Sequence, residues 1–112
     1  MANQSEHKKD KIEFDSEGFL KDLTLWSEAL AKTMALNEGI TISPAHMEVI
    51  YLLRESYHKH KVPLANRPFV KLVKNHLGSD KGNSIYLLTL FPESPAKICA
   101  KISGLPKPAN CL

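Results

Sequence analysis

The C-terminal stretch limits the fold of this chain most, because it contains two prolines and ends next to a cysteine. Residues 104–112 read Gly-Leu-Pro-Lys-Pro-Ala-Asn-Cys-Leu. Pro106 and Pro108 lack a backbone N–H and push the residue before each toward extended geometry, which excludes a helix. We therefore predict a mobile, polyproline-like arm over residues 105–112. At about 3.1 Å per residue, such an arm carries Cys111 on the order of 20 Å from its attachment.

The length and composition are those of one globular domain. The chain has 112 residues, of which 43% are hydrophobic and 24% charged. Residues 1–10 are polar and offer nothing to bury, so we expect a disordered leader before a single domain over residues 11–104. No apolar stretch approaches the roughly 20 residues of a membrane span, and no signal-peptide core is present. We expect a cytoplasmic protein without a membrane partner.

Periodicity and turn residues predict a mainly helical α+β fold. Alternating polar and apolar residues at 11–15, followed by a turn at 15–18, predict a small N-terminal β-hairpin or meander. Apolar residues three and four apart then predict a bundle of about five helices, bounded by prolines, glycines and capping residues. The helices are expected at about 24–37, 44–60, 68–77, 85–91 and 95–103.

Cys111 is the strongest candidate for a reactive group, because a core cysteine is rarely placed beside a mobile terminus. The thiol attacks only as a thiolate, and Lys101 and Lys107 are cations close in sequence that could support it. Cys99 lies in the last predicted helix, where a buried core residue is the favoured interpretation. The arm could bring Cys111 to Cys99 as a disulfide, although nothing local demands it. Two cysteines do not define a zinc site, so we expect no metal and no cofactor.

Other charged residues have weaker claims. Arg67 precedes the proline of the third predicted helix and is either a surface charge, which is favoured, or an anion-binding group at that helix's N-terminus. The five histidines are expected to be solvated. The second and third helices also resemble a helix-turn-helix, with Lys71, Lys74 and His76 facing outward. Packed helices with solvated lysines are far commoner than a pair that reads DNA.

Several short motifs together resemble the DsrC/TusE family of small sulfur-trafficking proteins, over about residues 12–112. The resemblance implies a small β element on a helical bundle, with a flexible C-terminal arm that carries sulfur as a persulfide on Cys111. Weaker agreement includes Trp26 and Arg67. The strongest matches are Lys81-Gly82-Asn83-Ser84, Leu90-Phe91-Pro92, Pro95-Ala96-Lys97 and Gly104-Leu105-Pro106-Lys107-Pro108.

Members of this family differ in a second cysteine, eleven positions before the penultimate one. The resemblance implies that members with both thiols work with dissimilatory sulfite reductase, whereas members with one relay sulfur for 2-thiouridine synthesis on tRNA. In this chain that position, 111 − 11 = 100, holds Ala100. Its neighbour Cys99 would point about 100° away on a helix. The relay role is therefore expected.

We accordingly predict a sulfurtransferase of the persulfide-carrier type. The resemblance implies that Cys111 takes sulfur from a TusBCD-like donor complex and passes it to an MnmA-like tRNA 2-thiouridylase. Direct nucleic-acid binding is not expected, because the net charge is only +3 and its cations are scattered. Two alternatives stay open. One is a DsrC-type subunit or partner of dissimilatory sulfite reductase, and the other is a helix-turn-helix DNA-binding regulator.

Overall fold

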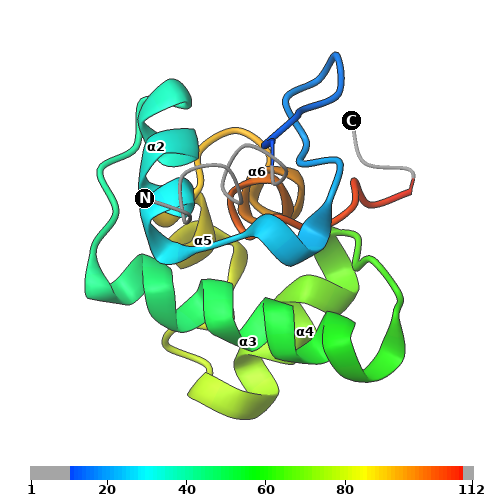
Figure 1. Ribbon diagram of the computed structural model, residues 1–112. Coiled ribbons are helices and arrows are strands. Elements are labelled where there is room, and N and C mark those ends of the chain that lie inside the picture. The colour runs from blue at the N-terminus through cyan, green and yellow to red at the C-terminus, as the bar shows by residue number, and fades with distance from the viewer. Residues whose placement is uncertain (1–10, 110–112) are drawn as a thin grey trace.

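The computed structural model describes residues 11–109, and the regular elements of this part of the chain are helices. Figure 1 shows the last helix near the centre, and this helix contacts each of the four other α-helices. The elements, in order, are the 3-10 helix η1 (Leu23–Leu25) and the α-helices α2 (Glu28–Asn37), α3 (Pro44–His60), α4 (Asn66–Leu77), α5 (Ser84–Leu90) and α6 (Pro95–Ile102).

The predicted N-terminal β-hairpin is wrong, and with it the α+β fold class. Within residues 11–109 the strand-like pairing is a single antiparallel bridge between Phe14 and Leu20. The carboxylate of Asp15 accepts hydrogen bonds from the backbone N–H groups of Glu17 and Phe19, each at 2.9 Å. A side chain that bonds its own neighbours in this way competes with ladder formation. The alternating sequence therefore forms a tight loop, and the fold is all-helical over the described residues.

Local caps determine where the helices begin. Ser27, Ser43 and Asn83 each accept a hydrogen bond from a backbone N–H in the first turn of α2, α3 and α5. The first predicted helix started too early, because residues 23–25 form the separate turn η1 before the Ser27 cap. The third started too late, because α4 already begins at Asn66 and includes Pro68 in its first turn.

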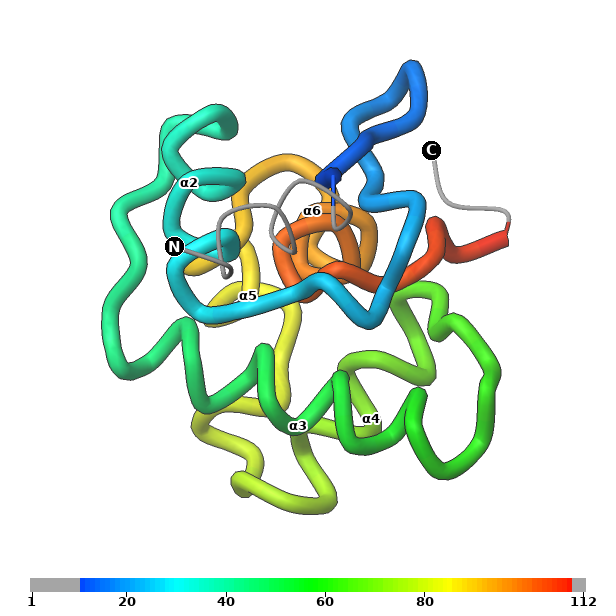
Figure 2. The backbone as a smooth tube through the Cα atoms, viewed as in Figure 1, coloured from blue at the N-terminus to red at the C-terminus, as the bar shows by residue number. Residues whose placement is uncertain are grey.

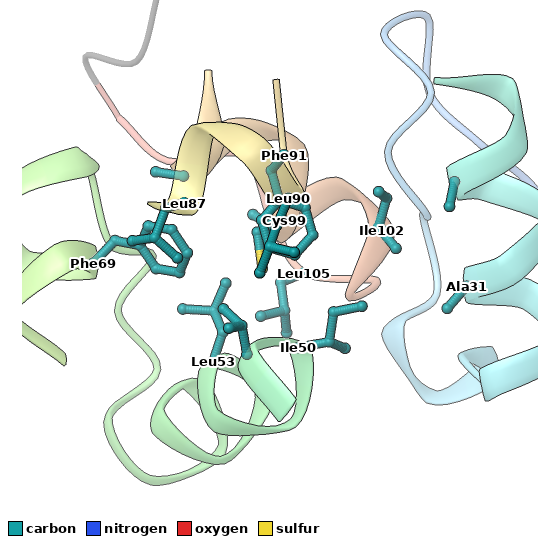
Figure 3. Packing of buried hydrophobic residues seen from close by; sticks show 14 of the residues in the cluster. Ala31, Ile50, Leu53, Phe69, Leu87, Leu90, Phe91, Cys99, Ile102 and Leu105 are labelled. Atoms are coloured by element: carbon teal, nitrogen blue, oxygen red, sulfur yellow. The ribbon is translucent and has the colours of Figure 1, made fainter. Parts of the chain in front are cut away.

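Small residues on α6 let the surrounding helices approach it closely. Ala96, Cys99 and Ala100 are all buried, and Ile102 fills the space toward α2. Figure 3 shows Cys99 among Leu90, Phe91 and Leu105, with Ile50 and Leu53 of α3 facing it. Because so many elements share this helix, the position of its C-terminal end is fixed by the whole core.

His46 is a buried polar residue that joins α3 to the end of α5. Its Nδ1 accepts from the backbone N–H of Ser43 at 3.1 Å and from the Ser43 hydroxyl at 2.7 Å. Nε2 lies 2.9 Å from the carbonyl oxygen of Leu90, which can only accept, so Nε2 carries the proton. The neutral ring is thus fully bonded, and the expectation that all five histidines are solvated is wrong here.

We expect the Tm to fall as the pH falls below about 6.5, partly through His46. Burial lowers the pKa of His46 below its ordinary value of 6.5, so the unfolded chain binds the proton first. The stabilisation is complete above pH 6.5 and is lost as the pH falls from there toward the lower folded pKa. Thermal melts at pH values between about 7.5 and 5 measure it. In His46→Gln the Tm should be lower throughout and less dependent on pH, and an unchanged acid-side slope would contradict this assignment.

Candidate functional site

The chain leaves α6 through a buried segment, Ser103 to Leu105, which we call the arm root. The backbone N–H of Gly104 donates to the carbonyl of Lys101 at 3.1 Å, and that of Leu105 donates to Ala100 at 2.9 Å. Gly104 has a φ of +71°, in the left-handed region that favours glycine. The Leu105 side chain packs into the core beside Cys99 (Figure 3). The arm therefore starts from a fixed point.

Trp26 and Arg54 hold the arm root from the outside. Trp26 Nε1 donates to the carbonyl of Ile102 at 2.9 Å, and Arg54 Nη1 donates to the carbonyl of Ser103 at 2.7 Å. These bonds satisfy carbonyls that the end of a helix leaves without partners. The Arg54 guanidinium also lies over the Trp26 ring, 3.9 Å from its centroid. A Cβ on Gly104 would stand 2.5 Å from Trp26 Cδ1, so the ring requires glycine at that position.

The arm is also attached beyond its root. Pro108 is fully buried, and Lys107 Nζ lies 3.0 and 3.3 Å from the two carboxylate oxygens of Glu17. Lys97 Nζ lies 3.7 Å from the same carboxylate. The hydrogen bond from Lys107 is the main cause that lowers the pKa of Glu17. Figure 2 traces the arm from α6 toward the side where the N-terminal loop lies. A buried proline and an exposed ion pair thus hold the described part of the arm.

The three cations predicted to support the thiolate differ in burial: Lys101 is mostly buried, whereas Lys107 and Arg67 are exposed. Lys101 is mostly buried, with its Nζ 3.1 Å from Glu38 and 5.3 Å from the centroid of the Phe19 ring. Lys101 and Lys107 flank the same N-terminal loop, and each is paired with a carboxylate. Arg67 is exposed in the first turn of α4. Cys111 lies outside the described residues.

Cys99 is sealed in the core. Its side chain is fully buried, and its Sγ lies 3.7 Å from the hydroxyl oxygen of Ser103. Burial raises the pKa of the Cys99 thiol to about 12. The thiol is therefore almost entirely protonated near neutral pH, whereas nucleophilic attack and metal binding need the thiolate. Ala100, the neighbouring position, is also buried.

Arg54 is the member of this site that the sequence interpretation missed. Arg54 directly follows the buried Leu53 in α3, and its side chain is itself partly buried. The signal in the sequence was an arginine next to the buried face of a helix, because such a side chain can lay its apolar stem along the core and bring its guanidinium to a polar group there. Its partner Ser103 lies 49 positions later in the chain, which no local pattern reveals.

Residues 11–109 contain neither a metal-binding cluster nor a membrane-spanning helix. No three potential metal-binding side chains gather in this part of the chain. None of its helices combines the length and the apolar character that crossing a membrane requires. The described site therefore consists of the arm root, its contacts with Trp26 and Arg54, and the attachments of Lys107 and Pro108.

Comparison with known proteins assigns the chain to a family. The family model described as "DsrC like protein" matches residues 6–112. The chain belongs to the DsrC-like family. A relative of this DsrC-like chain, sulfurtransferase TusE of Salmonella typhimurium (strain LT2), is 51% identical over 102 residues, which are 91% of this chain and 94% of the relative.

Two solved DsrC structures share the fold. The NMR structure of Allochromatium vinosum DsrC has a TM-score of 0.80 and 39% identity, covering 88% of each chain. The crystal structure of the oxidized gamma-subunit of the dissimilatory sulfite reductase (DsrC) from Archaeoglobus fulgidus has a TM-score of 0.77 and 34% identity, covering 91% of this chain and 93% of that one.

These matches confirm the predicted family and the predicted class, a sulfurtransferase that acts as a sulfur carrier. Membership of the DsrC-like family alone does not separate a sulfurtransferase from a reductase subunit, because this chain is similar to proteins named as each. The distinction has to come from the thiols of this particular chain. In this chain position 100 is alanine, and the neighbouring Cys99 is fully buried.

Proposed function

We propose that Cys111 carries sulfur as a persulfide and relays it for 2-thiouridine modification of tRNA. The observation that carries this proposal is the burial of Cys99. With Cys99 protonated in the core and alanine at position 100, Cys111 is the cysteine left for exchange chemistry. The 51% identity to a sulfurtransferase TusE supports the relay branch of the family.

The proposed chemistry is thiol–persulfide exchange. The Cys111 thiolate attacks the outer sulfur of a persulfide on the donor, the donor's S–S bond breaks, and the donor cysteine leaves as a thiolate. In the second step a thiolate on the acceptor attacks the outer sulfur on Cys111, and the Cys111 thiolate leaves. Each step moves one sulfane sulfur and needs no external oxidant or reductant. The proposed donor is TusBCD-like and the proposed acceptor an MnmA-like 2-thiouridylase, both in the cytoplasm.

The attachment of Pro108 limits how far the thiol travels. Cys111 follows Pro108 by three residues, so its Cα stays within about 10 Å of Pro108 while that residue remains buried. A deeper partner site requires Pro108 and Lys107 to leave their contacts with the body. The Lys107–Glu17 pair is well suited to release, because solvent screens an exposed ion pair and it contributes little to stability. Once released, Lys107 is a cation that can support the thiolate. Lys101 and Arg67 are weaker candidates for this role.

The proposed domain organisation follows the same division. Residues 11–104 form one domain around α6, residues 1–10 are a leader, and residues 105–112 are the arm that carries the thiol. The contacts of α6 with α2, α3, α4 and α5 support a single domain.

Intact mass measurement tests the proposal. The reduced protein is incubated with a cysteine desulfurase, cysteine and the relay donor, and wild type is compared with Cys111→Ser and Cys99→Ala. We expect the wild type and Cys99→Ala to gain one sulfur atom and Cys111→Ser to gain none. The proposal fails if the wild type gains no sulfur or if both cysteines are needed.

A second candidate is a partner of dissimilatory sulfite reductase, favoured by the match to the Archaeoglobus fulgidus subunit. In a two-thiol version of this role, Cys99 would have to leave the core to meet Cys111. A mild oxidant and non-reducing peptide mapping test that requirement. Ready formation of a Cys99–Cys111 disulfide at neutral pH would favour the reductase role over the relay.

A further inference from the structure

We propose that a groove beside the arm root docks an acidic segment of the protein that exchanges sulfur with Cys111. This inference rests on the proposed carrier function. The groove, which we call the root groove, includes a pocket of about 230 Å³ between η1, the C-terminal half of α3 and the arm root. Its cationic side chains are Arg54 and Lys61, with His58 beside them, and its other walls include Leu23, Tyr57 and Leu105.

Arg54 and His58 are four residues apart on α3, so their side chains share one helix face. Lys61 is the C-cap residue of α3, with left-handed backbone, and it completes the lining at the end of the helix. A shallower hollow of about 470 Å³ continues the groove along α3, lined by Tyr51, Glu55, Arg54 and His58. From Tyr51 to Lys61 the helical rise gives a length of about 15 Å, which suits a short peptide segment of a partner.

The charge of the root groove selects for carboxylates. The acidic residues at its edge already have partners, since Glu55 Oε2 lies 3.7 Å from Lys59 Nζ and Glu28 accepts from the Tyr51 hydroxyl. The lining of the pocket itself holds two positive charges, Arg54 and Lys61, and no carboxylate. Charge complementarity of this kind steers and orients protein association.

A protein segment fits the root groove better than RNA does. Leucine side chains of η1 and of the arm root line the groove together with the Tyr57 ring, which gives a partner apolar surface to bury. Phosphate backbones instead need a series of cations along the whole contact, and the net charge of the chain is only +3. The inference therefore commits to an acidic protein segment.

The position of the root groove connects docking to transfer. Leu105 lines the groove and is also the first residue of the arm. Cys111 follows it by six positions, a span of at most about 20 Å. A partner seated in the groove is thus held within the radius of the thiol, and docking places its reactive sulfur where the arm can reach it.

Charge reversal tests the inference with the full-length chain. Initial rates of sulfur transfer from the desulfurase-charged donor complex are measured for wild type, His58→Glu, Lys61→Glu and the double variant. The matched control for Lys61→Glu is Lys71→Glu, which makes the same charge change on α4, away from the lining of the groove. We expect the apparent KM for the donor to rise about fivefold in each single variant and at least about twentyfold in the double variant, with kcat within about twofold. The difference should shrink as salt increases.

Direct binding separates this inference from the carrier function. Calorimetry measures the Kd of the uncharged donor complex for Cys111→Ser chains with and without the reversals, so no sulfur transfer is needed. Weaker binding by the reversals, with the Lys71→Glu control unchanged, supports the docking site even if the wild type takes up no sulfur.

Several results overturn the docking site. These are equal Kd values for reversals and wild type, no binding of the donor to any chain, and a Lys71→Glu variant that alone loses binding. Reversals that weaken binding of tRNA but not of the donor would also overturn it, by assigning the groove to nucleic acid. The neutral variant Lys61→Gln should give an intermediate KM value. Thermal melts confirm that each variant is folded.

Discussion

Replacement of Gly82 by alanine is expected to lower the Tm by on the order of 15 °C or to prevent folding. An alanine Cβ at this position would overlap Cα, N and Cβ of Lys74, well inside the 3.0 Å that real Cβ atoms keep. Lys74 is in the last turn of α4, and the overlapping atoms include its backbone, which cannot move aside as the end of a flexible side chain could. Gly82 is also tied in place by a 2.8 Å hydrogen bond from its N–H to the carbonyl of Gly78. Forced overpacking of this kind costs about 3 kcal/mol or more, and each kcal/mol is worth about 4–8 °C in a domain of this size.

Gly39→Ala provides the matched control for Gly82→Ala. Gly39 has a φ of +76°, but a Cβ there would meet nothing within 4 Å. The control therefore measures backbone strain without a clash, expected at about 1–2 kcal/mol. Circular dichroism melts and the yield of soluble protein compare the two variants. If Gly82→Ala melts no lower than Gly39→Ala, close packing of the loop on α4 is not what requires glycine.

Gly104→Ala is expected to be the second most damaging substitution, and its effect should be seen at Trp26. It combines a φ of +71° with a Cβ 2.5 Å from Trp26 Cδ1 and 2.9 Å from Trp26 Cγ. The ring has to move, which breaks its bond to the Ile102 carbonyl and its stacking with Arg54. We expect a loss of about 2–4 kcal/mol. Trp26 is the one tryptophan of the chain, so intrinsic fluorescence reports this displacement directly as a shift of emission to longer wavelength.

A double-mutant cycle isolates the contact between Gly104 and Trp26. A Trp26→Ala background removes the two nearest atoms, Cδ1 and Cγ, and keeps Cβ at 3.0 Å. Gly104→Ala should then cost less, closer to the backbone strain that Gly39→Ala reports. The coupling free energy should be about 1 kcal/mol or more. Additive effects of the two substitutions would contradict the proposed clash. Sulfur uptake by Gly104→Ala should also be slower, because the arm would start from a displaced root.

Local rules predicted the helices well, because their determinants are adjacent in sequence. The Ser43-Pro44 pair marks the start of α3, and Pro95 marks the start of α6. The N-terminal loop was predicted wrongly because the same local rules were applied to it. Alternation at residues 11–15 is compatible with a strand, and nothing in that pattern says that the Asp15 carboxylate takes the backbone hydrogen bonds.

The site was only partly predictable, because its contacts join distant parts of the chain. The prolines of the arm were visible in the sequence, whereas the burial of Pro108 depends on the folded surface beneath it. Lys101 and Lys107 were identified as cations near the arm, but their partners Glu38 and Glu17 lie 63 and 90 positions away. The assignment of the carrier thiol to Cys111 stays a prediction, since that residue lies outside those described.

The seal around Cys99 also decides how this protein meets oxidative stress. A carrier with two accessible thiols can shelter an oxidised sulfur as an internal disulfide, and one reductant then restores it. Here the second sulfur is enclosed by the core. With Cys111 as the proposed carrier thiol, we expect a sulfenic acid on it to be captured from outside, by glutathione or by another copy of the chain. Its fate then depends on protein concentration and on the glutathione pool. A relay built this way stops during oxidation by becoming a mixed disulfide or a covalent dimer, and resumes when thiol exchange frees it.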